Sequence, residues 1–258
     1  MESVQTADNV CEFARYAGLI KLACSRCALH DRCLPQGLSA GETHRFEQIV
    51  TRSRPIQPGE HLFLAGEEFR FIATVRTGCF KSYVIDHEGK QQVLEFAFPG
   101  DVIGLDAIHA HRQRTNVVAL ETSAVCRLTI ESVSSMMRHL PELQAELFHV
   151  MSSRISELES TAGQPSADER VALFLISISE NFYRRGYSAS ELHLAMSRYD
   201  IASYLKLTPE TISRVLSRFQ NDGVLRVGPK QVSICDHEKL KKIAGQKPEH
   251  GLDVARRA

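Results

Sequence analysis

Short stretches in which apolar and polar residues alternate fill positions 40–130 of the chain. The clearest of them read HLFLAG, FIATVRTG, KSYVID, QVLEFAF and AVCRLTI. Turn-forming residues separate these stretches, at Pro58-Gly59, Gly66, Gly78, Gly89, Pro99-Gly100 and Gly104. Strands of this length, with turns at short intervals, are typical of antiparallel barrels and sandwiches. We therefore predict a β domain over residues 39–131.

After Ser132 the apolar residues recur at intervals of three and four, which predicts a long amphipathic helix over residues 132–162. A stripe sustained over several turns is either a core face or a coiled-coil seam. The segment that follows, TAGQPSADER, has the composition of a linker, so the helix does not fold straight back on the chain. We therefore interpret the stripe as a dimer interface. Its members are Leu143, Leu147, Val150, Met151, Ile155 and Leu158.

Two short helices joined by a tight turn are predicted within the segment MSRYDIASYLKLTPETISRVLSRFQNDGVL. Lys206 and Leu207 form the turn, and Thr208 stands at the N-cap position of the second helix. Pro209 occupies the first helical position, where the missing N–H costs nothing. This is the layout of a helix-turn-helix, and the hairpin-like stretch LRVGPKQVSI after it resembles a wing. We place this domain at residues 163–258.

The outward face of the second helix suits the edges of DNA bases. Arg214 can donate two hydrogen bonds to guanine, and Glu210 can accept one from the amino group of cytosine. Residues 198–230 contain six basic and three acidic side chains, although the formal net charge of the whole chain is zero. Such a local positive balance is what contact with phosphates requires. The residues expected at the DNA are Thr208, Glu210, Thr211, Ser213, Arg214, Ser217 and Arg218.

Three cysteines lie close together in the stretch LACSRCALHDRCLP, within residues 1–38. The chain shows neither a signal peptide nor an apolar run long enough to cross a bilayer, so we expect a cytoplasmic, reduced protein. In that setting Cys24, Cys27 and Cys33 indicate a metal or redox site rather than disulfides. Four-thiolate coordination needs one more cysteine. Zinc and iron–sulfur clusters both meet this spacing, and the spacing does not separate them.

An enzymatic role finds no support in the sequence. We find no P-loop, no G-x-G-x-x-G after a strand, and no Ser/His/Asp set in the context of a motif. We therefore expect a protein that is not an enzyme.

The succession of β domain, long helix and helix-turn-helix resembles the CRP/FNR superfamily of bacterial transcription regulators. LTPETISRVLSRF resembles the recognition helix of the FNR branch, whose Glu-x-x-Ser-Arg signature corresponds here to Glu210, Ser213 and Arg214. GKQQVLEFAFPGDVIGLDAI and ALETSAVC resemble segments of the FNR β-roll. The resemblance implies an α+β fold. Its parts are an N-terminal cysteine arm, a β-roll (double-stranded β-helix, jelly-roll-like) sensor domain, a dimerisation helix and a C-terminal winged helix-turn-helix.

The resemblance also implies a cofactor and partners. FNR proteins hold one [4Fe-4S] cluster per chain with a C-x2-C-x5-C segment and a cysteine of the β-roll, which correspond here to Cys24, Cys27, Cys33 and Cys126. The function implied is oxygen-responsive regulation by a homodimer that binds an inverted repeat close to TTGAT-N4-ATCAA. RNA polymerase is the implied partner, with the loop Phe98–Asp101 as a candidate contact. We hypothesise that cluster ligation favours packing of the dimer helix.

Two alternatives keep the DNA-binding fold. In the first, the cysteines hold a structural zinc ion, which metal analysis distinguishes. In the second, the β-roll binds a cyclic-nucleotide-like effector, as in the CRP branch, where a Gly-Glu pair and an Arg-Ser/Thr pair form the pocket. Here Leu105 follows Gly104, so the glutamate is missing, whereas Arg114-Thr115 retains a version of the second pair.

Overall fold

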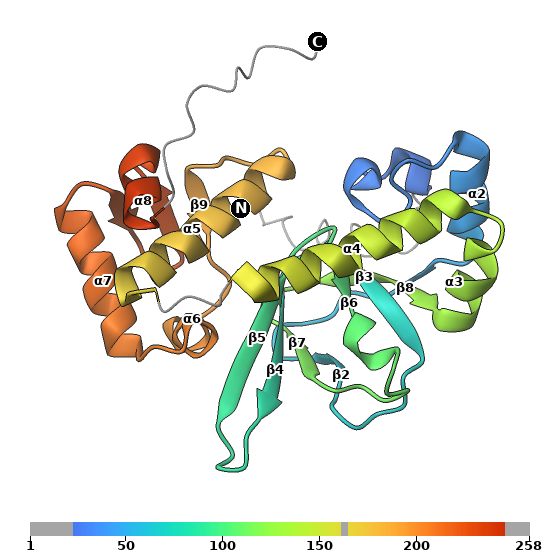
Figure 1. Cartoon of the computed structure of the whole chain (residues 1–258), viewed down its shortest axis with the longest axis horizontal. Helices are drawn as coiled ribbons and strands as arrows, with labels where there is room; N and C mark the ends of the chain where they lie inside the picture. The colour runs from blue at the N-terminus through green and yellow to red at the C-terminus, as the bar shows by residue number, and fades with distance from the viewer. Residues whose placement is uncertain (1–22, 161–164, 246–258) are drawn as a thin grey trace, which may run out of the picture.

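The computed structural model describes residues 23–160 and 165–245, except for the side chains of residues 157–160 (Figure 1). The predicted cysteine arm is thus described from residue 23 onward. Figure 1 shows the β-roll and the cysteine segment at one end of the molecule, the C-terminal domain at the other, and helix α4 (Pro141–Ser160) running between them. No helix among the described residues is both long and apolar enough to span a membrane.

The β-roll is built from two antiparallel four-stranded sheets, with strand orders β1-β8-β3-β6 and β2-β7-β4-β5. Phe80, Val117 and Val125 are completely buried between the sheets, because alternate residues of each strand face inward. Each of the five stretches with an alternating pattern overlaps one of these strands. The strands are β1 (Thr51–Arg52), β2 (His61–Phe63), β3 (Phe71–Thr77), β4 (Phe80–Ile85), β5 (Gln91–Ala97), β6 (Val102–Ile103), β7 (Asn116–Ala119) and β8 (Ala124–Thr129).

Short helices flank the β-roll. The cysteine segment contains η1 (Cys24–Arg26) and η2 (His30–Arg32), and η3 (Leu105–Ala107) follows β6. Helix α2 (Ala40–Gln48) was not predicted, although Ser39 and Glu42 form a capping box at its start.

The single helix predicted over residues 132–162 is divided in two. Helix α3 (Ile130–Met137) ends before the completely buried Leu140, and α4 (Pro141–Ser160) begins at a proline. Proline has no N–H to donate to the preceding turn, so it begins a helix more readily than it continues one. The apolar period continues across the break, which is why the sequence pattern conceals it.

The C-terminal domain is a winged helix-turn-helix, as predicted. Helix α6 (Arg198–Leu205) ends at Lys206, whose φ of +52° makes the tight turn, and α7 (Pro209–Asn221) begins after the N-cap Thr208. The wing pairs β10 with β11, and β11 with a strand that was not predicted, β9. The other elements are α5 (Ala167–Arg184), β9 (Glu191–His193), β10 (Leu225–Val227), β11 (Gln231–Ile234) and α8 (His237–Ile243).

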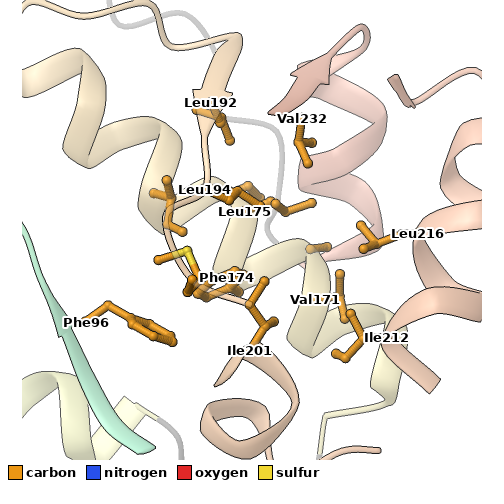
Figure 2. Close-up of a cluster of buried hydrophobic side chains, with 14 of the residues drawn as sticks. Phe96, Val171, Phe174, Leu175, Leu192, Leu194, Ile201, Ile212, Leu216 and Val232 are labelled. Carbon is orange, nitrogen blue, oxygen red and sulfur yellow. The ribbon is translucent and has the colours of Figure 1, made fainter. Parts of the chain in front are cut away.

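One buried cluster joins the two domains (Figure 2). Phe96 of β5 packs against Phe174 of α5 and Tyr204 of α6, with ring centroids 6.1 and 5.3 Å away. The same cluster continues through Ile201 to Ile212 of α7, so the helix-turn-helix packs directly on the β-roll. The structure confirms the predicted α+β architecture of β-roll, long helix and winged helix-turn-helix.

Candidate metal centre and DNA-reading surface

The four cysteines predicted to bind metal line one small cavity of about 30 Å³. Cys24 is the first residue of η1, Cys27 is its C-cap residue, and Cys33 is the C-cap residue of η2. Cys126 lies on β8, where it pairs with Thr74 of β3 and Arg52 of β1. The structure therefore brings together thiols that are about one hundred residues apart in the sequence.

Tight turns hold the cysteine segment in place. The N–H of Cys27 donates to the carbonyl of Cys24 over 3.1 Å, and the N–H of His30 donates to the carbonyl of Cys27 over 3.0 Å. Leu34 and Leu38 anchor the end of the segment in a buried cluster that also contains Leu143. The cysteine segment and helix α4 thus share a hydrophobic core.

The cavity disfavours free thiolates. Burial raises the pKa of Cys24 to about 11 and that of Cys33 to about 12, and in both cases the nearby Cys126 adds to the rise. Burial also raises the pKa of Cys126, although the positive charges of Arg76 and Arg52 oppose this. At neutral pH the thiols of Cys24, Cys33 and Cys126 are therefore protonated without metal, and metal binding by them must release protons.

Thr74 supplies a hydroxyl group at the wall of the cavity. Its side chain is almost completely buried, and Oγ1 has no hydrogen-bond partner of ordinary geometry among the described residues. It nevertheless lies close enough to Cys33 to lower the pKa of that thiol, against the larger effect of burial. A buried hydroxyl without a partner is costly unless something in the cavity accepts its hydrogen. Thiolate or sulfide sulfur would do so.

The donor set fits a four-thiolate cofactor, since cysteine thiolates are the ligands of [4Fe-4S] clusters. Arg52 and Arg76 would offset the negative charge that four thiolates bring. The four thiols surround the cavity without forming a ready-made ligand group, and no other group of three or more His, Cys, Asp or Glu side chains within the described ranges is arranged to hold a metal ion. The remaining described cysteines lie apart from the cavity, Cys79 buried and Cys235 exposed.

Arg52, Thr74 and Arg76 also line the cavity and were not predicted from the sequence. Thr74 and Arg76 alternate along β3, which places them on the same face of that strand. This alternation along β3 is the one signal in the sequence that could have indicated Thr74 and Arg76 together. Only the register of β3 with β8 shows that Cys126 lies beside Thr74.

Helix α7 presents the predicted DNA-reading side chains to solvent. Thr208 caps the helix by accepting the N–H of Thr211 over 3.2 Å. Arg214 donates to the Thr211 hydroxyl over 3.2 Å, and Ser213 donates to the carbonyl of Pro209 over 2.9 Å. Thr211 is half-buried, and the other six predicted contacts are exposed, namely Thr208, Glu210, Ser213, Arg214, Ser217 and Arg218.

Arg218 differs from the other side chains of this face because its partner is an acidic side chain on another helix. Its guanidinium forms an ion pair with Asp168 in the first turn of α5. Contact with a DNA phosphate would compete with this pair.

The predicted dimer stripe separates into two faces of α4. Leu143 and Leu147 are 1% and 6% exposed in the chain's own core, and Val150 packs beside them. Met151 and Ile155 are 38% and 57% exposed. These exposed residues are joined by Phe148, which is 57% exposed and was not predicted. Leu158 belongs to α4, but its side chain lies outside the described part of the chain.

The loop Phe98–Asp101 is not the free contact surface that the resemblance suggested. Phe98 is buried among residues of the C-terminal domain. Asp101 forms an ion pair with Arg185 over 3.2 Å. The C-terminal domain therefore holds this loop at both Phe98 and Asp101, and its contact with RNA polymerase stays a prediction.

Comparison with known proteins follows the same division of the chain. Residues 53–139 match the family described as the cyclic nucleotide-binding domain, and residues 169–243 match the Crp-like helix-turn-helix domain. The fumarate and nitrate reduction regulatory protein of Vibrio cholerae is 37% identical over 236 residues, covering 90% of this chain and 94% of that protein. Electron transport regulator A of Shewanella oneidensis is 38% identical over 225 residues, covering 86% of this chain and 90% of that protein.

The fold has relatives among solved structures. FixK2 from Bradyrhizobium japonicum aligns with a TM-score of 0.68 and 26% identity, covering 76% of this chain and 97% of that one. The 37% and 38% identity to the two regulatory proteins, over most of each chain, places this chain in their family. The chain belongs to the FNR branch of the CRP/FNR superfamily of transcription regulators.

Proposed function

We propose that this chain is an oxygen-responsive transcription regulator that holds one [4Fe-4S] cluster through Cys24, Cys27, Cys33 and Cys126. The observation that carries the proposal is the single cavity lined by all four thiols. The names of the relatives support a role in anaerobic or redox-responsive regulation, since they denote fumarate and nitrate reduction and electron transport. Such a regulator acts in the cytoplasm, where thiols stay reduced.

The residues around the cavity have distinct roles in this proposal. The four thiols would bind the cluster, which supplies a redox centre that oxygen destroys. Thr74 would donate a hydrogen bond toward sulfur, while Arg52 and Arg76 would balance negative charge. Hydrogen bonds and charge near sulfur are what tune such centres.

DNA binding by a homodimer completes the proposal. Two α7 helices, one from each protomer, would read half-sites one helical turn apart. The operator implied by the Glu210, Ser213 and Arg214 signature is an inverted repeat resembling TTGAT-N4-ATCAA. The seam that we propose between protomers contains the exposed Phe148, Met151 and Ile155 and continues toward Leu158.

The cysteine segment and the dimer helix share a core, which supports a link between ligation and dimer packing. Leu34 and Leu38 of the segment lie in the same buried cluster as Leu143 and Leu147 of α4. Segment and helix therefore stabilise each other's position. RNA polymerase remains the proposed partner in activation.

Metal analysis separates this function from a structural zinc site. The protein should be purified without oxygen and assayed for iron, acid-labile sulfide and zinc per chain. We expect about four irons and four sulfides, as a four-cysteine [4Fe-4S] site requires. Zinc in their place would refute the cluster, and a metal-free chain would direct the search for an effector to the β-roll.

A further inference from the structure

Arg185 connects the DNA-binding domain to a loop of the β-roll. It is the C-cap residue of α5, and its side chain is only 6% exposed. The guanidinium donates to the carbonyl of Pro99 and, over 3.2 Å, to a carboxylate oxygen of Asp101. It also lies over the ring of Phe98, with Cζ 5.5 Å from the ring centroid. Because a buried charge must be well paired, these contacts fix the loop Phe98–Asp101 at the end of α5.

The same loop touches the cysteine segment. A Cβ atom added to Gly100 would lie 2.8 Å from the carbonyl oxygen of Arg32, so the two backbones are in close contact. Arg32 directly precedes Cys33, whose thiol lines the candidate metal cavity. Gly100 has a φ of +99°, a conformation that side chains other than glycine rarely adopt. Conformation and contact therefore both require glycine here.

Backbone hydrogen bonds also hold the loop on β3 beside the cavity. The N–H of Gly100 donates to the carbonyl of Val75 over 2.8 Å, and the N–H of Val75 donates to the carbonyl of Asp101 over 2.9 Å. Val75 and its neighbours Thr74 and Arg76 all line the cavity. A shift of the cavity wall thus reaches the loop without passing through α4.

Phe98 extends the connection into the DNA-binding domain. Its ring packs edge-on against Phe182 of α5, with centroids 6.0 Å apart. The buried cluster around it includes Ile201 of α6 and Ile212 of α7. Close-packed cores have low compressibility and transmit displacements, so a change at this loop is felt by both helices that position the DNA-reading face.

We propose that the loop Phe98–Asp101 conveys the state of the cysteine segment to the DNA-binding domain, and that Arg185 is the positioning residue for this connection. Figure 1 shows why a connection is needed, since α7 and the cysteine segment lie at opposite ends of the molecule. The inference rests on the proposed function only in taking the cysteine segment as the sensing part. It adds a route within one chain that is separate from the dimer helix.

A double-mutant cycle on the full chain tests this route. Gly100→Ala presses the loop against Arg32, and Arg185→Gln removes the guanidinium on the opposite side. The readout is backbone hydrogen exchange in residues 182–187 and 198–205, measured without oxygen alongside circular dichroism. We expect Gly100→Ala to alter exchange in both stretches, and the alteration to disappear when Arg185→Gln is present. The same alteration in both backgrounds, or none in either, would overturn the proposal.

Two matched variants control for strain and charge. Gly59→Ala introduces a side chain at a φ of +83° where no atom lies within 4 Å. Arg184→Gln removes the same charge from the preceding, exposed residue. Neither should change exchange in the two stretches or abolish the effect of Gly100→Ala.

A second comparison leaves the loop unchanged, so it remains valid if Gly100→Ala does not fold. Exchange is measured with and without bound metal in the natural chain and in Arg185→Gln. The route predicts that Arg185→Gln keeps the metal-dependent difference in residues 23–38 but loses it in residues 182–205. A retained difference in residues 182–205 contradicts the route. A chain without iron and sulfide refutes the cluster instead, and the double-mutant cycle still tests the route.

Discussion

Lys81 of β4 and Asp200 of α6 form an ion pair between the β-roll and the helix-turn-helix, with 2.5 Å between Nζ and Oδ1. Both side chains are only 14% exposed. Asp200 also accepts the N–H of Ser197 over 3.0 Å, which completes the capping box of α6. One carboxylate therefore both begins the first helix of the DNA-reading unit and fixes that helix to the sensor domain.

Asp200→Asn should lower the free energy of unfolding by about 1–3 kcal/mol near pH 7, because it removes charged hydrogen bonds from a mostly buried site. Burial opposes ionisation of Asp200, but hydrogen bonds from Lys81 and Ser197 outweigh it, and the pKa is lowered. The carboxylate's contribution is therefore complete above its unfolded pKa of about 3.9 and is lost as pH falls through the lower folded value.

Denaturant titrations of both chains at several pH values check this. The difference between natural chain and variant should be constant from about pH 6 to 8 and should vanish well below pH 4. Glu68→Gln is the matched control, since its ion pair with Arg70 is about three-quarters exposed on both sides and should contribute little. A difference that grows on acidification would contradict the assignment.

Cys126→Ser should abolish iron and sulfide incorporation while leaving the chain folded. Serine fits the half-buried strand position but replaces the thiolate that a four-cysteine cluster needs. The check is iron and sulfide per chain after anaerobic reconstitution. Cys235→Ser, at an exposed cysteine outside the cavity, should retain both. Full incorporation by Cys126→Ser would remove this residue from the proposed ligand set.

Arg214→Ala should weaken binding to the inverted repeat by about 1–3 kcal/mol per half-site, which is roughly 5- to 150-fold. Fluorescence anisotropy on the repeat, and on a version with its guanines replaced, measures the effect. The loss should be large on the first DNA and small on the second, because the contact is to a base. Equal losses on both would mean that Arg214 contacts phosphate instead.

Ile155→Glu should raise the dimer dissociation constant by about two to four orders of magnitude, because an apolar contact of about 1.5–3 kcal/mol is lost from each of the two protomers. Sedimentation equilibrium of the anaerobic protein measures this constant. Ile85→Glu is a close control, since Ile85 and Ile155 are both 57% exposed but Ile85 is the last residue of β4, whose hairpin with β5 points away from α4 (Figure 1). An unchanged constant for Ile155→Glu would place the seam elsewhere.

The sequence predicts the helix-turn-helix well because its signals are local. The cap at Thr208, the proline at the first helical position and the apolar period of α7 all agree within a few residues. The same holds for the strands of the β-roll, where alternation and glycine turns coincide. Cys24, Cys27 and Cys33 also stand out by spacing alone, whereas Cys126 required the resemblance.

Contacts between distant segments could not be predicted in this way. The stripe on α4 is broad enough to serve two faces, and only the position of the β-roll shows that Leu143 and Leu147 are covered while Phe148 is exposed. Asp101, which pairs with Arg185, lies 84 residues before it in the sequence, and no periodicity of the sequence links the two residues. Arg52 and Arg76 likewise meet the cysteines only through strand register.

We propose above all that the four-cysteine site controls DNA binding in response to oxygen. The most direct measurement follows iron content and affinity for the inverted repeat in one anaerobic sample while air is admitted. We predict that iron is lost and that affinity for the repeat falls in parallel. Loss of iron with unchanged affinity would contradict the claim, because the cysteine site would then bind a cluster without controlling the DNA-reading domain.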